Sequence, residues 1–258
     1  MSDVTGVAER PRAYVSVQGP HAVQFLNRML SQDVPDSGSV DALLLTAKAR
    51  VVAPVLVWRR GDDDVLLLTE PELGETLRAQ LLRARFAARC EIELEQHRST
   101  IVFGDEADGI PNRDYGVAAR ELLDAGLEPT LDDEGLERLR IEARTPRYGR
   151  EIDDRVLPAE AGLDERAVSF TKGCYPGQEP VARQHNRGKV NRRLRVLEVA
   201  GAAPAAETPV VLGEKDVGRV TSAVPGLVLA YVRVEVPDDA ELTVAGAPAR
   251  LHLPTGRP

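Results

Sequence analysis

One stretch of the chain gathers the residue types that can carry out chemistry. Residues Lys172 to Glu179 read Lys-Gly-Cys-Tyr-Pro-Gly-Gln-Glu and hold one of only two cysteines in 258 residues. The glycines and proline predict a tight turn, and the residues from about Gln178 predict a helix with Pro180 in its first turn. Cys174 is therefore expected near a helix N-terminus, where the helix and Lys172 would stabilise a thiolate or an anionic ligand. The alternative interpretation is a buried, inert cysteine in an ordinary loop.

The elements that must position this turn alternate between strands and amphipathic helices. Strands are expected at 13–17, 43–46, 51–58, 65–69, 91–95 and 101–103. Helices are expected from Gly19-Pro20 to about Ser31, and over 72–88, 116–124 and about 132–143, the last with Thr130 as its cap. Pro54 indicates an edge or a bulge within its strand.

After residue 191 the pattern changes to short strands separated by Gly, Pro and Asp turns, between 193 and 251. Close spacing without helices predicts a small antiparallel β-barrel. The expected architecture is α+β. A first module covers 1–190 and can divide into two interleaved subdomains, and a C-terminal barrel covers 191–258.

The turn sequence resembles the Lys-Gly-Cys-Tyr-x-Gly-Gln-Glu signature of the YgfZ family, which comprises folate-binding proteins related to the glycine-cleavage aminomethyltransferase. Patchy similarity extends from about Tyr14 to Arg233. The resemblance implies an aminomethyltransferase-like fold, a tetrahydrofolate or one-carbon-substituted folate as cofactor, and a role in assembling or repairing iron–sulfur clusters of client proteins. Two other functions stay open: a folate-dependent aminomethyltransferase or demethylating enzyme, and a non-catalytic folate-sensing adaptor. Where the aminomethyltransferases carry an acidic–aromatic pair after Lys-Gly, this chain has Cys174-Tyr175, which argues against aminomethyl transfer.

The resemblance also assigns roles to single residues. Cys174 would be the reactive thiol and Lys172 its electrostatic support. Asp33 would face the folate, although a solvated helix-end aspartate is the alternative. Glu142, within Leu139-Arg-Ile-Glu-Ala, would line the folate pocket, although a helix-end salt bridge with Arg144 or Arg147 is equally compatible with the sequence. The residues expected at the folate are Asp33, Glu142, Tyr148, Gly173, Tyr175, Gly177, Gln178, Glu179 and Arg183.

Composition limits the partners. A net charge of -8 and a pI of about 5.2 argue against a nucleic-acid-binding protein. The first twelve residues lack a signal-peptide pattern, and no apolar run is long enough for a membrane span, so a cytoplasmic protein without membrane contact is expected. Cys90 and Cys174 are expected as free thiols, too few for a complete iron–sulfur site. The expected partners are therefore folate and iron–sulfur client or assembly proteins.

Two further features have competing interpretations. The basic run Arg183, Arg187, Lys189, Arg192, Arg193 and Arg195 is either a solvated face or a site for the carboxylates of a folate glutamyl tail. The four histidines are scattered, so no metal site is expected. A Cys174–His185 pair would need the fold to bring the two together.

Overall fold

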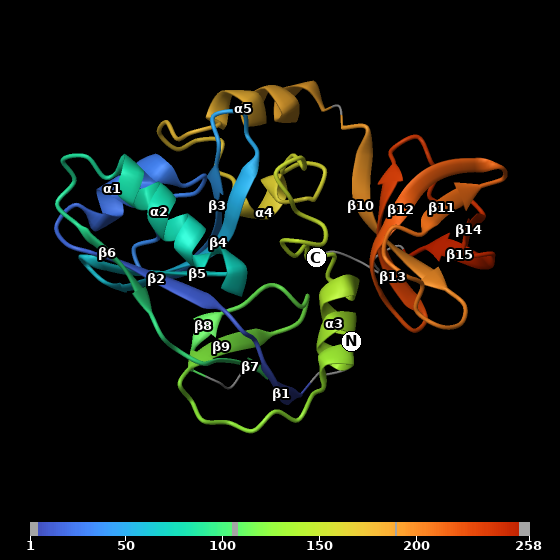
Figure 1. The fold of residues 1–258 in the computed structure, drawn as a ribbon, viewed down its shortest axis with the longest axis horizontal. Coiled ribbons are helices and arrows are strands. Elements are labelled where there is room, and N and C mark those ends of the chain that lie inside the picture. Colours follow the sequence, from blue (N-terminus) through green and yellow to red (C-terminus); the bar gives the residue numbers. More distant parts are fainter. Residues whose placement is uncertain (1–4, 105–107, 189, 253–258) are drawn as a thin grey trace.

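The computed structural model describes residues 5–104, 108–188 and 190–252 (Figure 1). Two antiparallel sheets with their helices form the larger part of the molecule, and a closed barrel lies at the other end. This arrangement confirms the predicted α+β class with a C-terminal antiparallel barrel. No helix within the described ranges is long and apolar enough to cross a membrane.

The first sheet has five antiparallel strands. In spatial order they are β3 (Gly38–Leu45), β4 (Val51–Gly61), β5 (Asp64–Thr69), β2 (Ala13–Gln18) and β6 (Glu91–Glu95). The helices α1 (Ala22–Met29) and α2 (Gly74–Ala84), the latter preceded by the 3-10 turn η1 (Pro71–Leu73), place apolar faces on this sheet. The predicted amphipathic helix over 72–88 is confirmed by α2, in which Leu77 and Leu81 are fully buried.

The second sheet has four antiparallel strands and begins with the N-terminal strand. In order they are β1 (Gly6–Glu9), β7 (Ser99–Phe103), β9 (Ala119–Leu123) and β8 (Ile110–Pro111). The predicted helix over 116–124 is wrong, because β9 pairs with both β7 and β8. Tertiary pairing overrides helix propensity here: Glu121 is fully buried and held by Arg12.

Three helices connect the sheets to the barrel. Helix α3 (Asp133–Glu142) is capped by Asp132, which accepts a 2.8 Å hydrogen bond from the Gly135 amide. The predicted cap, Thr130, instead accepts a hydrogen bond from the Val7 amide at 2.9 Å and so ties the loop to β1. The short α4 (Asp164–Ala167) and then α5 (Gln178–Arg187) follow, and α5 begins where the sequence predicted.

The barrel closes in the order β10, β13, β12, β11, β14 and β15. Its strands are β10 (Arg192–Val199), β11 (Pro209–Leu212), β12 (Lys215–Val224), β13 (Leu227–Arg233), β14 (Leu242–Val244) and β15 (Ala247–Leu251). A buried carboxylate joins it to the rest of the molecule. Glu151 accepts a 2.6 Å hydrogen bond from Ser222 of β12 and lies 3.0 Å from Arg140 of α3, while Tyr231 of β13 donates to its backbone carbonyl.

Candidate functional site

The turn between α4 and α5 rests on the tip of the β3–β4 hairpin (Figure 1). Gly177 caps α5 with φ at 84°, in the left-handed region. A Cβ atom there would lie 2.5 Å from the Thr46 carbonyl oxygen and 3.2 Å from the Ala49 Cα. Only glycine meets both the conformational and the steric requirement. Gly173 differs, because a Cβ at that position would meet nothing within 4 Å.

Lys172 anchors this turn to the loop that follows α1. Its side chain is almost fully buried, and Nζ donates to the carbonyl oxygens of Leu30 at 2.9 Å and Gln32 at 2.8 Å. Asp33 completes the arrangement with Oδ1 at 3.5 Å. Burial lowers the pKa of Lys172, and Asp33 offsets only part of that effect. The structure thus brings Lys172 and Asp33 together, a contact that the sequence did not predict, and directs the ammonium to this loop.

Cys174 is exposed and a free thiol. Its neighbour Tyr175 is buried, with its ring centroid 5.6 Å from the Lys172 Nζ and its hydroxyl without a hydrogen-bond partner. Gln178 contacts the Lys172 carbonyl at 3.5 Å. On α5, Glu179 and Arg183 are exposed.

His185 stacks on Phe170 with centroids 3.9 Å apart. Its Nδ1 lies 3.9 Å from Asp164, so the ring is already engaged by groups other than Cys174.

Glu142 ends α3 with an exposed side chain. In contrast to Glu142, Arg140 and Glu151 are buried. Arg140 forms ion pairs with Glu137 at 2.6 Å and Glu151 at 3.0 Å. Tyr148 is half-buried and packs against two of the apolar cores.

A small central cavity lies where β4 separates from β5. The predicted edge or bulge at Pro54 is wrong, because β4 lies inside the sheet and Pro54 pairs in register with Leu43 of β3. The proline is tolerated because the β4–β5 ladder begins only at Leu56, so Pro54 needs no partner on that side. The cavity has a volume of about 50 Å³ and is bounded by β4, the segment after α3, and α4. Its charged lining residues are Arg10, Arg12, Asp41, Glu70, Asp114, Arg140, Arg147 and Arg166. Asp33, Glu142, Lys172 and Cys174 are not part of this lining.

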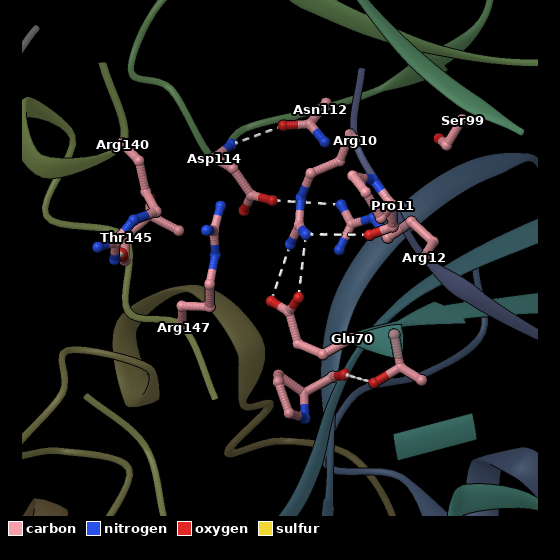
Figure 2. Close-up of polar contacts among 12 residues, drawn as sticks. Arg10, Pro11, Arg12, Glu70, Ser99, Asn112, Asp114, Arg140, Thr145 and Arg147 are labelled. Atoms are coloured by element: carbon pink, nitrogen blue, oxygen red, sulfur yellow. Dashed lines mark hydrogen bonds and ion pairs between the residues drawn. The ribbon is translucent and has the colours of Figure 1, made fainter. Parts of the chain in front are cut away.

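Most of these charges are paired across the cavity wall (Figure 2). Arg10 donates two hydrogen bonds, of 2.9 and 2.8 Å, to the Glu70 carboxylate. Arg166 lies 2.9 Å from both Asp41 and Asp114. Burial raises the pKa of Asp41, and the Arg166 ion pair offsets this only in part. For Asp114 burial also raises the pKa, but the attraction of Arg12 and Arg166 outweighs it, and the pKa is lowered. Such arginine–carboxylate pairs fix the positions of the side chains in the cavity wall.

Two polar groups of the wall are buried without a hydrogen-bond partner: Nε of Arg147 and the hydroxyl of Tyr115. The ion pair of Arg147 is a long one, 3.7 Å to Glu137, and Figure 2 shows its side chain between Arg10 and Arg140. Burial, then repulsion from Arg10 and Arg140, lowers the pKa of Arg147. Buried polar groups normally have partners, so these two indicate a place for water or a ligand.

A larger cleft of about 860 Å³ adjoins the cavity, between α3, the η1 turn and the barrel. Arg10, Glu70 and Arg147 line both spaces, so these side chains separate them. Tyr148 lines the cleft, as do Gly149 and Arg150. Of the residues expected at the folate, Tyr148 therefore lies in the cleft next to the charged cavity. Lys172 and Asp33 line neither space.

Comparison with known proteins supports the resemblance to one family. Residues 191–258 match the model of the CAF17 C-terminal beta-barrel domain. The chain is 25% identical over 291 residues to a protein of Pyricularia oryzae named iron-sulfur cluster assembly factor IBA57 homolog, mitochondrial, covering 94% of this chain and 74% of that protein. The barrel match and this relative support the predicted resemblance to the YgfZ, CAF17 and IBA57 proteins.

The family is related to the aminomethyltransferases. The glycine cleavage system aminomethyltransferase T of Bartonella henselae superposes with a TM-score of 0.82 at 18% identity, over 98% of this chain and 86% of that one, which confirms the predicted fold. An aminomethyltransferase of Moorella thermoacetica is 37% identical over 106 residues, or 40% of this chain. This chain spans only 29% of that protein, and 53% of an aminomethyltransferase from Nostoc.

The basic run divides between two elements. Arg192 lies 3.2 Å from Glu160 and stacks over Tyr231, and Arg195 pairs with Asp238. These contacts give Arg192 and Arg195 a structural role in the barrel. Lys189 and the side chain of Arg187 lie outside the described residues.

The cavity residues could not be found from sequence. They come from seven places in the chain: the segment after β1, β3, the residue after β5, the loop before β9, α3, the segment after α3, and α4. The available signal was weak: Glu70 directly follows the apolar strand Val65 to Thr69, and Arg10 and Arg12 flank a proline.

Proposed function

We propose that this protein binds tetrahydrofolate, or a one-carbon-substituted form, in the central cavity and adjoining cleft, and that it supports assembly or repair of iron–sulfur clusters in client enzymes. The single observation that carries the folate proposal is the pair of partnerless buried groups, Arg147 Nε and the Tyr115 hydroxyl, in a charged cavity. The cluster proposal is supported by the relative named as an iron-sulfur cluster assembly factor.

The residues fit a folate by chemistry. A pterin edge carries both donors and acceptors, which suits a wall containing Asp41, Asp114 and the Tyr115 hydroxyl. A glutamyl tail carries carboxylates, which suits Arg147 and Arg150 at the cleft. A bound folate would supply one-carbon chemistry, and the protein's own residues would orient it and exclude water.

The volumes add a condition. A cavity of about 50 Å³ has room for water rather than for a pterin, since ligand sites usually measure about 300–1,000 Å³. The cleft is large enough. Folate binding therefore requires a side chain of the shared wall to move. Arg147 is the candidate, because its ion pair at 3.7 Å is longer than the 2.8 Å ion pair between Arg10 and Glu70.

Cys174 is proposed as the reactive thiol, because it is exposed and free. Cys174 does not line the cavity and is exposed on the surface, so a client protein can reach its thiol. Asp33 and Lys172 then hold the loop beneath this turn, and Glu142 has no assigned contact with the folate. We do not propose aminomethyl transfer, because this chain spans only 29% and 53% of two aminomethyltransferases that it matches in sequence. The structural match to a third has 18% identity and shows the fold alone.

The folate proposal is tested by thermal shift with tetrahydrofolate. A ligand that binds only the folded state at about 100 times its Kd adds about 2.7 kcal/mol. We expect a clear rise in Tm for the wild type, a smaller rise for Arg147→Met and Tyr115→Phe, and an unchanged rise for the exposed control Arg233→Met. No shift at millimolar tetrahydrofolate would refute folate binding.

The cluster proposal needs a separate test in cells. A deletion strain should lose activity of iron–sulfur enzymes, and wild-type protein should restore it. Cys174→Ser should fold and bind folate but fail to restore activity. Full rescue by Cys174→Ser would exclude the thiol and favour an adaptor, whereas one-carbon release from glycine or an N-methyl amine would favour the enzyme.

A further inference from the structure

Phe86 is an anomalous residue on the surface. It follows the last turn of α2, its φ is 41°, in the left-handed region, and the residue is 91% exposed. Glycine or asparagine is the usual residue in such a conformation after a helix. Phenylalanine there gains nothing from burial and adds strain. The requirements of the fold therefore do not explain an aromatic residue at this position.

Phe86 borders an apolar groove of about 430 Å³ between α2 and the tip of the β3–β4 hairpin. We call it the Phe86 groove. Its walls include Met29, Leu44, Arg83, Ala84, Phe86 and Pro176. Pro176 belongs to the turn that carries Cys174, so the groove and the exposed thiol share one face of the molecule.

The charge in the groove lining has one sign. Arg83 is the charged residue of its lining, and no carboxylate lines it. Lys48 and Arg28, each next in sequence to a lining residue, are exposed. Within the described part of the chain, none of these three cations forms an ion pair. In a protein of net charge -8, a basic rim around an apolar centre is a local reversal of sign.

We propose that the Phe86 groove docks an acidic partner protein, which inserts one or two large apolar side chains beside Phe86 and sets its carboxylates against Arg28, Lys48 and Arg83. The apolar centre would supply the affinity, as in other interfaces with aromatic anchors. The basic rim would select an acidic partner and speed its approach. Docking here brings the partner to the turn that holds Cys174. The proposal does not depend on folate binding.

The test uses a labelled amphipathic peptide with leucine and phenylalanine on one helical face and glutamate on the other. The matched control peptide has lysine in place of every glutamate. Fluorescence anisotropy with the full chain should show binding of the acidic peptide, weakening as salt rises, and at least tenfold weaker binding of the basic one. Equal affinity for the two peptides would overturn the charge argument.

Variants locate the site. Phe86→Asn and Arg83→Glu should each weaken binding of the acidic peptide about tenfold or more. The matched controls Leu127→Asn and Arg98→Glu change an exposed apolar and an exposed basic residue elsewhere, and should bind like wild type. Unchanged binding by Phe86→Asn would refute the proposal.

A stability measurement separates lost docking from lost folding. Asparagine tolerates the left-handed conformation, so Phe86→Asn should keep or raise Tm, by about 2 °C. A lowered Tm would assign Phe86 a structural role and overturn the inference. Sedimentation of the chain alone provides the last control, since self-association abolished by Phe86→Asn would make the groove a contact between copies of this chain.

Discussion

Three glycines near α5 allow backbone strain to be measured apart from steric overlap. Gly173 has no positive φ, and a Cβ atom added to it would have no neighbour within 4 Å. Gly188 has φ at 61° but open space, and Gly177 has φ at 84° and the Thr46 carbonyl oxygen 2.5 Å from the position of a Cβ. Gly173→Ala should change the free energy of unfolding by about 0.5 kcal/mol or less. Gly188→Ala should cost about 1–2 kcal/mol, the penalty for a Cβ atom in the left-handed region.

Gly177→Ala adds overlap with the hairpin backbone to that strain. Overpacking costs about 1–3 kcal/mol, so the total is about 2–5 kcal/mol, equivalent to a fall in Tm of about 4–20 °C. Urea denaturation followed by circular dichroism measures all three variants on one scale. If Gly177→Ala loses no more stability than Gly188→Ala, the close approach of the turn to the hairpin is wrong.

Three shorter predictions concern other parts of the molecule. Burial would lower the pKa of His97, but hydrogen bonds to Glu95 and Asp124 outweigh that effect and raise the pKa above 6.5. The stability that protonated His97 adds to the fold is therefore complete below pH 6.5 and is lost as the pH rises through the raised pKa. The Tm difference between wild type and His97→Gln should be larger at acidic than at alkaline pH, and the reverse order would contradict this. Glu151→Ala should cost about 3–5 kcal/mol in urea denaturation, because it leaves Arg140 short of a buried partner, while the exposed control Glu142→Ala stays within about 0.5 kcal/mol. Iodoacetamide should label Cys174 in the native protein and spare the buried Cys90 until unfolding, as mass spectrometry can check; equal rates would contradict the burial of Cys90.

Local patterns predicted local structure well. The glycines and proline before Gln178 placed the start of α5 correctly, because turn and helix-start preferences depend on neighbouring residues. The alternation after residue 191 likewise predicted the barrel strands. The helix predicted over 116–124 was wrong because the structure of this segment depends on residues distant in sequence. Arg12 neutralises Glu121 only in the folded sheet.

The candidate site shows the same division. The resemblance gave Lys172 and Asp33 separate roles, and only the fold shows that the two side chains meet. The cavity arginines are far apart in sequence, and nothing in their immediate neighbours distinguishes them from surface arginines. Arg147 illustrates the point, since its lack of a close partner follows from how α3, β1 and the η1 turn are packed together.

The path of the chain through the two sheets also constrains its synthesis. Strand β1 emerges first but pairs Gly6 with Phe103 on β7, and every strand of the first sheet lies between them in the sequence. At about 5–20 residues per second, β1 waits roughly 5–20 s for its partner. During that time it is an unpaired edge, and its length of only four residues, ending in Glu9, limits pairing with other nascent chains. The second sheet can therefore be completed only after all strands of the first sheet have been synthesised.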